Sequence, residues 1–383
     1  MSEYYIGLMS GTSMDAMDAV LVDFTPPTPQ KIAQLSRPIP PSLKRCLIHL
    51  CEQPEITLAS LTQADVLVGR LAASTVIELL QQNHLSAQQI IAIGCHGQTI
   101  FHRPGGTTPT SIQIGDPNII AHTTGITTVA DFRRRDLAAG GQGAPLVPAF
   151  HQALFATAKE RRTIVNIGGM ANITQLPREP QHVVIGFDTG PGNVLMDRWC
   201  ATHLGTPYDQ DGRWAASGHV NPALLERLLD EPFFAAQPPK STGRELFNLA
   251  WLAERLGATG QHLPPQDVQA TLCELTARTI TEAITRWAAG TERLLVCGGG
   301  SFNVTLRQRL QQLCAFPVET TGEYGFDAAW IEAMAFAWLA RETVSGRPGN
   351  LPSVTGATEP VTLGAIYPGK LRGELRDATL LTR

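Results

Sequence analysis

Residues 4–24 read YYIGLMSGTSMDAMDAVLVDF, and this stretch predicts two strands joined by a turn of small and polar residues. Apolar residues dominate residues 4–9 and residues 19–24, as expected for two buried strands. Residues 10–18 between them are rich in glycine, serine, threonine and aspartate, which favour turns. The chain is therefore expected to open with a strand, a glycine-rich turn and a second strand.

The same order recurs in the second half of the chain. Residues 163–167 and 172–176 are expected strands, and the sequence GGMA at 168–171 predicts a tight turn between them. Each half continues with a strand, helix, strand, helix, strand and a crossing helix. This repetition predicts an α/β protein with two duplicated lobes, each a mixed sheet flanked by helices, and a cleft between them. We expect the lobes to span residues 1–145 and 146–383, with the last helix and tail packing back on the first lobe.

The remaining expected elements follow the pattern of apolar residues and helix caps. Asp116 followed by Pro117 is typical of a helix start. We expect helices over 60–82, 147–156, 265–288, 303–312 and 328–341, a helix after Gly192, strands over 90–94, 127–132, 182–187, 294–297 and 316–319, and an irregular tail over 343–383.

Composition limits the possible partners and location. The 383 residues are 43% hydrophobic and 17% charged, with a net charge of −4, which gives no reason to expect nucleic acid or an anionic membrane as a partner. Seven cysteines without a CxxC pair argue against a disulfide framework or a zinc site. The N-terminus lacks a signal pattern, and no apolar run reaches the roughly 20 residues of a membrane span. We therefore expect a cytoplasmic protein.

The turn after the first strand is a candidate phosphate site. No GxxxxGK[ST] pattern occurs in the chain. Small residues nevertheless let backbone amides approach an anion, and nests of this kind bind phosphates. Carboxylates beside such a turn would repel ATP unless Mg²⁺ lies between them. An ordinary hairpin is the alternative interpretation. The candidate ATP-binding residues are Gly11, Thr12, Ser13, Met14, Asp15, Ala16, Met17 and Asp18, with Asp15 as the candidate Mg²⁺ ligand through water.

Two glycine-rich turns in the second half have the same physical logic. Gly168 and Gly169, followed by Asn172, would hold the phosphates from the other side. Gly298, Gly299 and Gly300 follow a buried strand and would let an adenosine lie against the backbone. They lack the spacing of a GxGxxG fingerprint, and a plain strand-to-helix turn remains the alternative.

Asp188 is the candidate catalytic base. The sequence GFDTGPGN at 186–193 places this carboxylate at the expected end of an apolar strand, followed by glycines and a helix start, and Gly190 among these glycines is a candidate for substrate binding. Strand ends that face a cleft are where α/β proteins place reactive groups. A carboxylate there can accept a proton from an attacking hydroxyl or water. The alternative is an aspartate that caps the turn through backbone amides.

Polar residues at other strand ends are candidates for substrate binding. Arginine suits bidentate recognition of carboxylates and phosphates, and the run RRR at 133–135 follows an expected strand. His96 and Gln98 follow another expected strand, where they could contact a sugar. A solvated charged face and a structural histidine are the alternative interpretations.

Taken together, the motifs resemble those of the actin, hexokinase and heat-shock ATPase superfamily. More narrowly, the chain resembles the anhydro-N-acetylmuramic acid kinases. The segments that carry this resemblance are GLMSGTSMDAMD at 7–18, GCHGQT at 94–99, DFRRRDLAAGGQGAPLVPAFH at 131–151, NIGGMANIT at 166–174, GFDTGPGNVLMD at 186–197 and LLVCGGGSFN at 294–303, and residues 330–339 extend the match.

The resemblance implies a reaction and roles for several residues. Members of this family use ATP and Mg²⁺ to phosphorylate the 6-oxygen of the sugar while water opens its 1,6-anhydro bridge, which serves cell-wall recycling. Carried over to this chain, residues 11–18 would bind ATP and Asp188 would activate the water. Arg135 would bind the sugar or its lactate carboxylate, and Glu332 would contribute from the closing helix. We also expect a homodimer.

One residue departs from the family pattern, and two rival functions stay open. Family members commonly have glycine where this chain has Ala16, and a positive φ there would strain the turn, so we expect an ordinary backbone conformation at Ala16. The first rival is a kinase for a plain sugar or a small acid on the same scaffold. The second is an ATP-driven clamp or filament protein.

Overall fold

The computed structural model describes residues 2–11, 13–53, 55–179, 182–260 and 262–370. These residues pack as two compact units. Of the described residues, those within 2–143, 332–350 and 357–370 form the first unit, and those within 144–331 and 351–356 form the second. No helix of the described ranges is long and apolar enough to cross a membrane.

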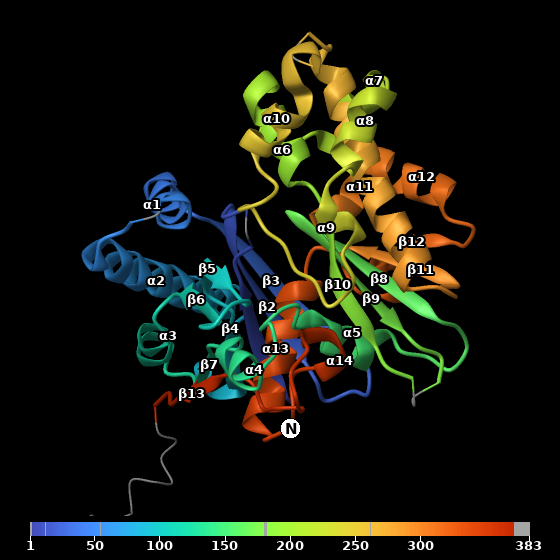
Figure 1. The fold of residues 1–383 in the computed structure, drawn as a ribbon. Helices are drawn as coiled ribbons and strands as arrows, with labels where there is room; N and C mark the ends of the chain where they lie inside the picture. The colour runs from blue at the N-terminus through green and yellow to red at the C-terminus, as the bar shows by residue number, and fades with distance from the viewer. Residues whose placement is uncertain (1, 12, 54, 180–181, 261, 371–383) are drawn as a thin grey trace, which may run out of the picture. The chain divides into compact units, whose positions relative to one another are not determined.

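The first unit is built on a six-stranded mixed sheet, in the order β13-β7-β4-β1-β2-β3 (Figure 1). Strands β1, β2 and β3 form an antiparallel meander, β4 lies parallel to β1, and β7 lies parallel to β4. A separate hairpin of β5 and β6 follows β4. The bounds are β1 (Tyr4–Met9), β2 (Ala16–Asp23), β3 (Gln30–Pro38), β4 (Ile90–Cys95), β5 (Gln98–Arg103), β6 (Thr110–Ile114), β7 (Thr128–Ala130) and β13 (Ala365–Tyr367).

The second unit repeats this topology in a five-stranded sheet, in the order β10-β9-β8-β11-β12. Its first three strands again form an antiparallel meander, β11 lies parallel to β8, and β12 lies parallel to β11. The bounds are β8 (Arg162–Ile167), β9 (Met170–Leu176), β10 (Ile185–Pro191), β11 (Arg293–Cys297) and β12 (Val318–Thr320). The shared strand order confirms the predicted α/β fold with a duplicated mixed sheet.

Helices cover both faces of the first sheet. On one face, apolar residues of β1, β2 and β4 form a core with α1 (Pro41–Glu52), α2 (Leu58–Gln82) and α3 (Pro117–Thr124). Helix α3 begins as its sequence predicts, because the Asp116 carboxylate accepts a hydrogen bond from the Asn118 amide at 2.8 Å. The same unit contains α4 (Arg134–Ala138), the short 3-10 helix at Ala87–Gln89, and nearly all of α13 (Ile331–Val344).

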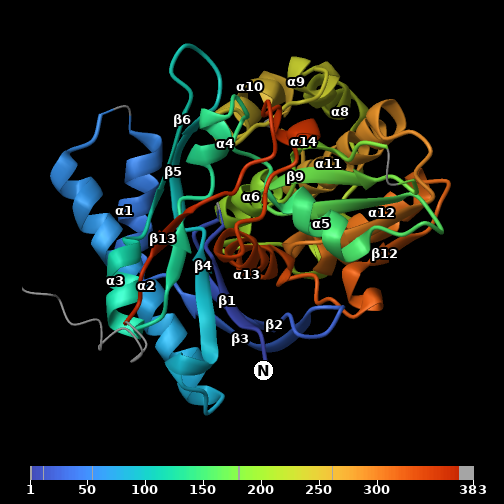
Figure 2. The same ribbon diagram turned by 90° about the horizontal axis from the view of Figure 1, so that it is seen from below.

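The other face of the first sheet is covered by α13 (Figure 2). This helix packs on the backbone of two paired glycines. Gly7 of β1 and Gly94 of β4 are register partners in the parallel ladder. A Cβ atom on Gly7 would lie 1.8 Å from the Ala333 carbonyl oxygen, and one on Gly94 would lie 1.9 Å from the Phe336 carbonyl oxygen. The helix contributes alanines to this face, so helix and sheet backbones come into direct contact.

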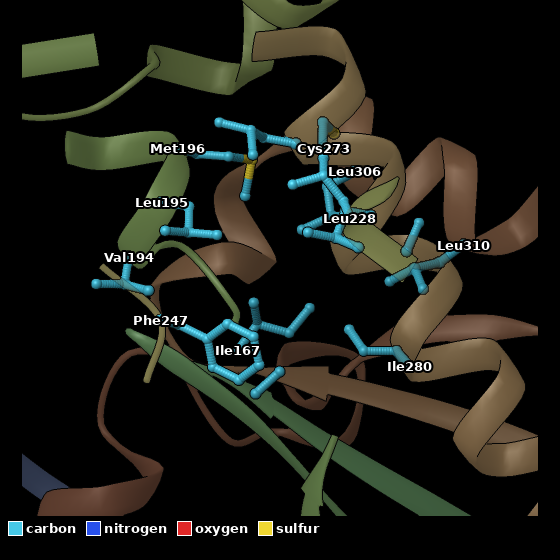
Figure 3. Close-up of a cluster of buried hydrophobic side chains, with 14 of the residues drawn as sticks. Ile167, Val194, Leu195, Met196, Leu228, Phe247, Cys273, Ile280, Leu306 and Leu310 are labelled. Carbon is cyan, nitrogen blue, oxygen red and sulfur yellow. The ribbon is translucent and has the colours of Figure 1, made fainter. Parts of the chain in front are cut away.

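The second unit has its main core between its sheet and the long helix α11 (Figure 3). Ile167 and Phe247 are fully buried in this cluster, together with Leu228 of α8 and Leu306 and Leu310 of α12. The helices of this unit are α5 (Val147–Phe155), α6 (Val194–Leu204), α7 (Arg213–Ser217), α8 (Pro222–Leu229), α9 (Pro232–Ala235), α10 (Leu249–Gly260), α11 (Pro265–Trp287), α12 (Val304–Leu313) and α14 (Pro352–Thr355), with 3-10 helices at Gln210–Gly212, Gly299–Phe302 and Thr321–Tyr324.

Several predicted boundaries were wrong, and three of them show the cause. Strand β2 begins at Ala16, not at residue 19, because residues 16–18 already pair with β3. Strand β10 runs over Ile185–Pro191, so it continues past the predicted end at residue 187. The tail after residue 343 is not entirely irregular, since Pro352–Thr355 is helical and Ala365–Tyr367 pairs with β7. In each case pairing or packing with another segment of the chain decided the boundary.

We predict that Gly94→Ala will lower the free energy of unfolding by about 1–3 kcal/mol, because the new methyl group must displace the backbone of α13. Urea unfolding followed by circular dichroism measures the change. Gly105→Ala is the matched control, since no heavy atom lies within 4 Å of its added Cβ. Equal stability of the two variants would contradict the role of Gly94.

Candidate functional site

In the first unit, the glycine-rich turn after β1 is held by Met14. The Met14 amide donates to the Gly11 carbonyl oxygen at 3.1 Å, and Met14 has a positive φ of 54°. Its side chain is buried in the core. Ser13 is exposed, and the position of a Cβ on Gly11 is open, with its nearest neighbour 3.9 Å away. The turn therefore presents small groups outward, while Thr12 lies outside the described residues.

Ala16, Met17 and Asp18 belong to strand β2 and not to the turn. Ala16 pairs with Pro38 and is not among the residues with positive φ, so the expectation of an ordinary conformation is confirmed. Among the described residues of the turn, Met14 is the one with a positive φ. The Met17 side chain is 1% exposed and packs in the core, which leaves only its backbone for contact with a ligand.

The two carboxylates beside this turn have different environments. Asp15 is exposed and forms an ion pair with Lys44, with 2.5 Å between Oδ1 and Nζ. Asp18 is half-buried and accepts a hydrogen bond from the Ser36 hydroxyl at 2.6 Å. Burial raises the pKa of Asp18, the Ser36 hydrogen bond lowers it, and the charge of Asp15 raises it again. Among the described residues, no three His, Cys, Asp or Glu side chains gather as a metal site.

His96 and Gln98 lie at the base of the β5–β6 hairpin and are fully buried. The Gln98 Oε1 accepts a hydrogen bond from the Ser10 hydroxyl at 2.7 Å. His96 Nδ1 lies 2.9 Å from the Gly97 carbonyl oxygen, and Arg133 Nη2 lies 2.8 Å from His96 Nε2. Burial, followed by the charge of Arg133, holds the pKa of His96 well below its ordinary value. A neutral His96 that accepts from Arg133 and donates to Gly97 fits these contacts.

The three arginines of 133–135 have separate environments. Arg133 binds His96 and also donates to the Gly143 carbonyl oxygen at 2.8 Å. Arg134 forms an ion pair with Asp131 at 2.7 Å. Arg135 is exposed, and its side chain has no polar partner among the described residues. Of the three guanidinium groups, that of Arg135 is therefore the one available to a ligand.

Sequence reasoning missed Asp136, which orders the loop after these arginines. Its carboxylate is fully buried and accepts hydrogen bonds from the Gly143 amide and the Asn350 side-chain amide, both at 2.7 Å. Asn350 is more than two hundred residues away in sequence. The only sequence signal was an aspartate beside an arginine run, which is equally typical of a solvated turn.

In the second unit, the turn at Gly168 and Gly169 is locked to the start of α6. The Gly168 carbonyl oxygen accepts from the Asn193 amide at 2.8 Å, and the Gly169 carbonyl oxygen accepts from the Gly192 amide at 2.9 Å. A Cβ on Gly168 would have no neighbour closer than 3.5 Å. Asn172 follows in β9, where it pairs with Asp188. This turn is thus fixed by its carbonyl groups.

The turn at Gly298–Gly300 lies against the same region. Gly298 has a positive φ of 78°, and a Cβ there would lie 2.3 Å from the Asn166 Oδ1. Gly300 packs against Ile167, whereas a Cβ on Gly299 would have only Asn193 Nδ2 within 4 Å, at 3.7 Å. Of the three, Gly299 therefore has the most space for a ligand to approach.

Asp188 lies within β10 at a β-bulge. Asp188 pairs with Asn172 and Gly190 pairs with Ala171, so Thr189 is the extra residue. The Asp188 Oδ2 accepts a hydrogen bond from the Thr242 amide at 2.9 Å, and the Asp188 amide donates to the Lys240 carbonyl oxygen at 3.1 Å. The predicted base is therefore fixed by a segment that the sequence analysis did not single out.

Gly190 and Glu332, both predicted to contact the substrate, have different settings. Gly190 is buried with a φ of 143°, and a Cβ there would lie 2.6 Å from the Phe234 ring, so this glycine is required by packing. Glu332 lies in the first turn of α13 and is half-buried. Glu332 belongs to the first unit and Gly190 to the second.

We predict that the buried neutral His96 makes the protein less stable as the pH falls below about 6.5. The unfolded chain binds a proton there that the folded chain excludes, so the free energy of unfolding falls by up to about 1.4 kcal/mol per pH unit for this group. His96→Asn should reduce the slope of the unfolding free energy between pH 6.5 and 5. Urea titrations at several pH values measure it, and an unchanged slope would contradict the prediction.

Comparison with known proteins identifies the family of this chain. A model of the family described as "Anhydro-N-acetylmuramic acid kinase" matches residues 3–369. The anhydro-N-acetylmuramic acid kinase of Coxiella burnetii (strain RSA 493 / Nine Mile phase I) is 52% identical over 369 residues, which cover 96% of this chain and 98% of that protein. The one from Pasteurella multocida (strain Pm70) is 53% identical over 367 residues, covering 95% and 97%.

Solved structures with a similar arrangement are more distant. An activator of 2-hydroxyisocaproyl-CoA dehydratase from Clostridium difficile with bound ADPNP has a TM-score of 0.45 and 10% identity, covering 89% of this chain and 96% of that one. A ROK family glucokinase from Streptomyces griseus in complex with glucose and AMPPNP has a TM-score of 0.39 and 11% identity, covering 88% and 99%. The assignment rests instead on the sequence matches along nearly the whole chain. The chain belongs to the anhydro-N-acetylmuramic acid kinase family.

Proposed function

We propose that this kinase uses ATP and water to convert 1,6-anhydro-N-acetylmuramic acid to N-acetylmuramic acid 6-phosphate. The observation that carries the proposal is the identity of about half of all residues with family members over 96% of the chain. The match includes the segments around both glycine-rich turns and Asp188, which lie within residues 3–369. Neither a plain sugar kinase nor an ATP-driven clamp accounts for this match.

ATP is proposed to bind through the glycine-rich turns. Residues 11–18 would hold phosphate oxygens through backbone amides and hydroxyls, supported by the open space at Gly11 and the exposed Ser13. In the second unit, the space at Gly168 and Gly299 supports phosphate and adenosine contacts there, with Asn172 close by in β9. Gly169, Gly298 and Gly300 would then shape the turns that leave this space.

Asp188 is proposed to be the general base. It would take a proton from water as the water oxygen bonds to carbon 1 of the sugar. The bond from carbon 1 to oxygen 6 breaks, and oxygen 6 accepts the γ-phosphoryl group while ADP leaves. The hydrogen bond that the Thr242 amide donates to Asp188 Oδ2 supports this role, because it fixes the direction of the carboxylate before the reaction.

Arg135 and Glu332 are proposed to bind the sugar, with Arg135 on the lactate carboxylate. The exposed guanidinium of Arg135 supports this, since both neighbouring arginines already bind protein groups. We propose that His96 and Gln98 support the residues that contact the sugar, because both side chains are buried and already hydrogen-bonded. Gly190 would contribute through the backbone at the bulge beside Asp188.

Mg²⁺ is the proposed metal, and the carboxylates beside the first turn fit it. Mg²⁺ favours one or two carboxylates together with phosphate oxygens and water, which suits a site without a three-ligand protein cage. Asp18 fits as a Mg²⁺ ligand, because burial and the negative charge of Asp15 both disfavour its ionised carboxylate when no cation is near. Asp15, which pairs with Lys44, would act through water. When bound, the ion would neutralise charge on the phosphates. We also propose a cytoplasmic homodimer that serves peptidoglycan recycling.

The reaction is tested by turnover of the anhydro-sugar and ATP in ¹⁸O-water. We expect one ¹⁸O atom at carbon 1 of the phosphorylated product by mass spectrometry, and no such product from Asp188→Asn, which should still bind ATP because the turn amides remain. Asp230→Asn, an exposed aspartate of the same unit, is the matched control and should keep wild-type turnover. Unlabelled phosphorylated product would overturn the proposed reaction.

Arg135→Ala should raise the KM for the sugar by roughly 10–100-fold, because a charge-assisted hydrogen bond of about 1.5–3 kcal/mol is lost. The KM for ATP should stay close to that of the wild type. Arg134→Ala is the control, since Arg134 pairs with Asp131 and not with a ligand. Steady-state kinetics decide the point, and a larger effect in Arg134→Ala would refute the assignment.

A further inference from the structure

The segment that holds Asp188 is a short strap at residues 240–242. Its contacts with the base come from two backbone groups, the Lys240 carbonyl oxygen and the Thr242 amide. The first accepts from the Asp188 amide at 3.1 Å, and the second donates to Asp188 Oδ2 at 2.9 Å. The carboxylate direction therefore depends on where this strap lies.

The strap is fixed in place by the Lys240 side chain. Lys240 is 7% exposed, and its Nζ donates to the carbonyl oxygens of Phe233 at 2.8 Å and Phe234 at 3.1 Å. The ammonium also lies 4.6 Å from the centre of the Phe233 ring and 5.7 Å from that of Phe187. Phe187 directly precedes Asp188 in β10. The lysine thus joins the strap, α9 and the strand of the base.

The aromatic residues around this lysine are themselves rigidly packed. The ring of Phe234 is stacked on that of Phe247 with centroids 5.5 Å apart, and Phe233 meets Phe247 edge to face at 5.9 Å. Phe247 is fully buried in the main core of the second unit (Figure 3). The core therefore holds the Phe233 and Phe234 carbonyl oxygens, which accept hydrogen bonds from the Lys240 ammonium. These two hydrogen bonds fix the strap in place.

Burying an ammonium group at this position has a desolvation cost, which argues for a role beyond packing. Burial and the nearby charge of Arg286 lower the pKa of Lys240 to about 8, whereas the Asp188 carboxylate raises it. An apolar side chain would fill the same aromatic surroundings without the cost of burying an ammonium group. Residues that oppose stability in this way are typical of functional sites.

We propose that Lys240 is a positioning residue for the catalytic base, and that it acts by fixing the strap whose Thr242 amide orients the Asp188 carboxylate. This inference rests on the proposed function, since it needs Asp188 to be the base. Lys240 itself takes no proton in the reaction. Its ammonium holds the two carbonyl oxygens, the strap holds the carboxylate, and the carboxylate then accepts the proton of water at carbon 1.

The test compares Lys240→Met with the wild-type enzyme. Methionine retains the length of the side chain and loses the ammonium, so kcat should fall about 10–100-fold, as expected when a reacting group is misplaced by a fraction of its hydrogen-bond length. The KM values for sugar and ATP should stay within about twofold, because the Lys240 ammonium is buried and already bonded to two carbonyl oxygens. Lys159→Met, an exposed lysine of the same unit, is the matched control and should keep the wild-type kcat.

A second variant distinguishes the effect of the Thr242 amide from that of the Thr242 side chain. The Thr242 hydroxyl is buried and has no hydrogen-bond partner among the described residues. Thr242→Val keeps the amide and loses only this hydroxyl, so any fall in its kcat should be smaller than the fall in Lys240→Met. A fall in kcat for Thr242→Val as large as that for Lys240→Met would overturn the proposal that the strap acts through its backbone.

The outcomes distinguish this inference from the proposed function. If the wild type does not phosphorylate the anhydro-sugar, the proposed function fails and the inference fails with it. If the wild type is active and Lys240→Met has the same kcat, or loses ATP binding together with kcat, only the inference is overturned. Should Lys240→Met not fold, Lys240→Gln takes its place, because its amide can donate to one carbonyl oxygen. Wild-type kcat in that variant would equally overturn the proposal.

Discussion

The first unit depends on the direct contact between the backbone of α13 and two adjacent glycines of the central strands. Gly7 and Gly94 are paired in the ladder, and any larger residue at either position would collide with a carbonyl oxygen of α13. The contact joins residues about 330 and 240 positions apart in sequence. It requires small residues on both sides, which the alanine-rich helix supplies.

The path of the chain follows from this contact. In each repeat, a helix that follows the last strand belongs to the other unit: α5, which comes after β7 and the short α4, belongs to the second unit, and α13, which comes after β12, belongs to the first. The first unit is therefore complete only when the end of the chain has been made. Phe336 of α13 packs on the His96 ring at 4.7 Å and on the Phe132 ring at 5.5 Å, so the same helix supports the segments that precede Arg135.

The second unit organises its candidate site by a different means. The turn at Gly168 and Gly169 is joined by backbone hydrogen bonds to the start of α6, and Asp188 is held by backbone groups of the strap at residues 240–242. Backbone contacts of this kind fix the direction of the candidate base Asp188, which suits a group that must keep one orientation. The kinase family to which the chain belongs is consistent with a site of this kind.

The sequence by itself determined the features that depend on local patterns. These were the strand, glycine turn and strand of each half, the cap of α3 at Asp116, the candidate Asp188 and the resemblance to the kinase family. Only the tertiary structure decided that Met14 and not Ala16 carries the positive φ, that β2 begins at Ala16, and that Asp136 and Lys240 order the surroundings of Arg135 and Asp188. The reason is physical: local patterns reflect short-range backbone preferences, whereas a buried charge acquires its meaning from partners that only folding brings near.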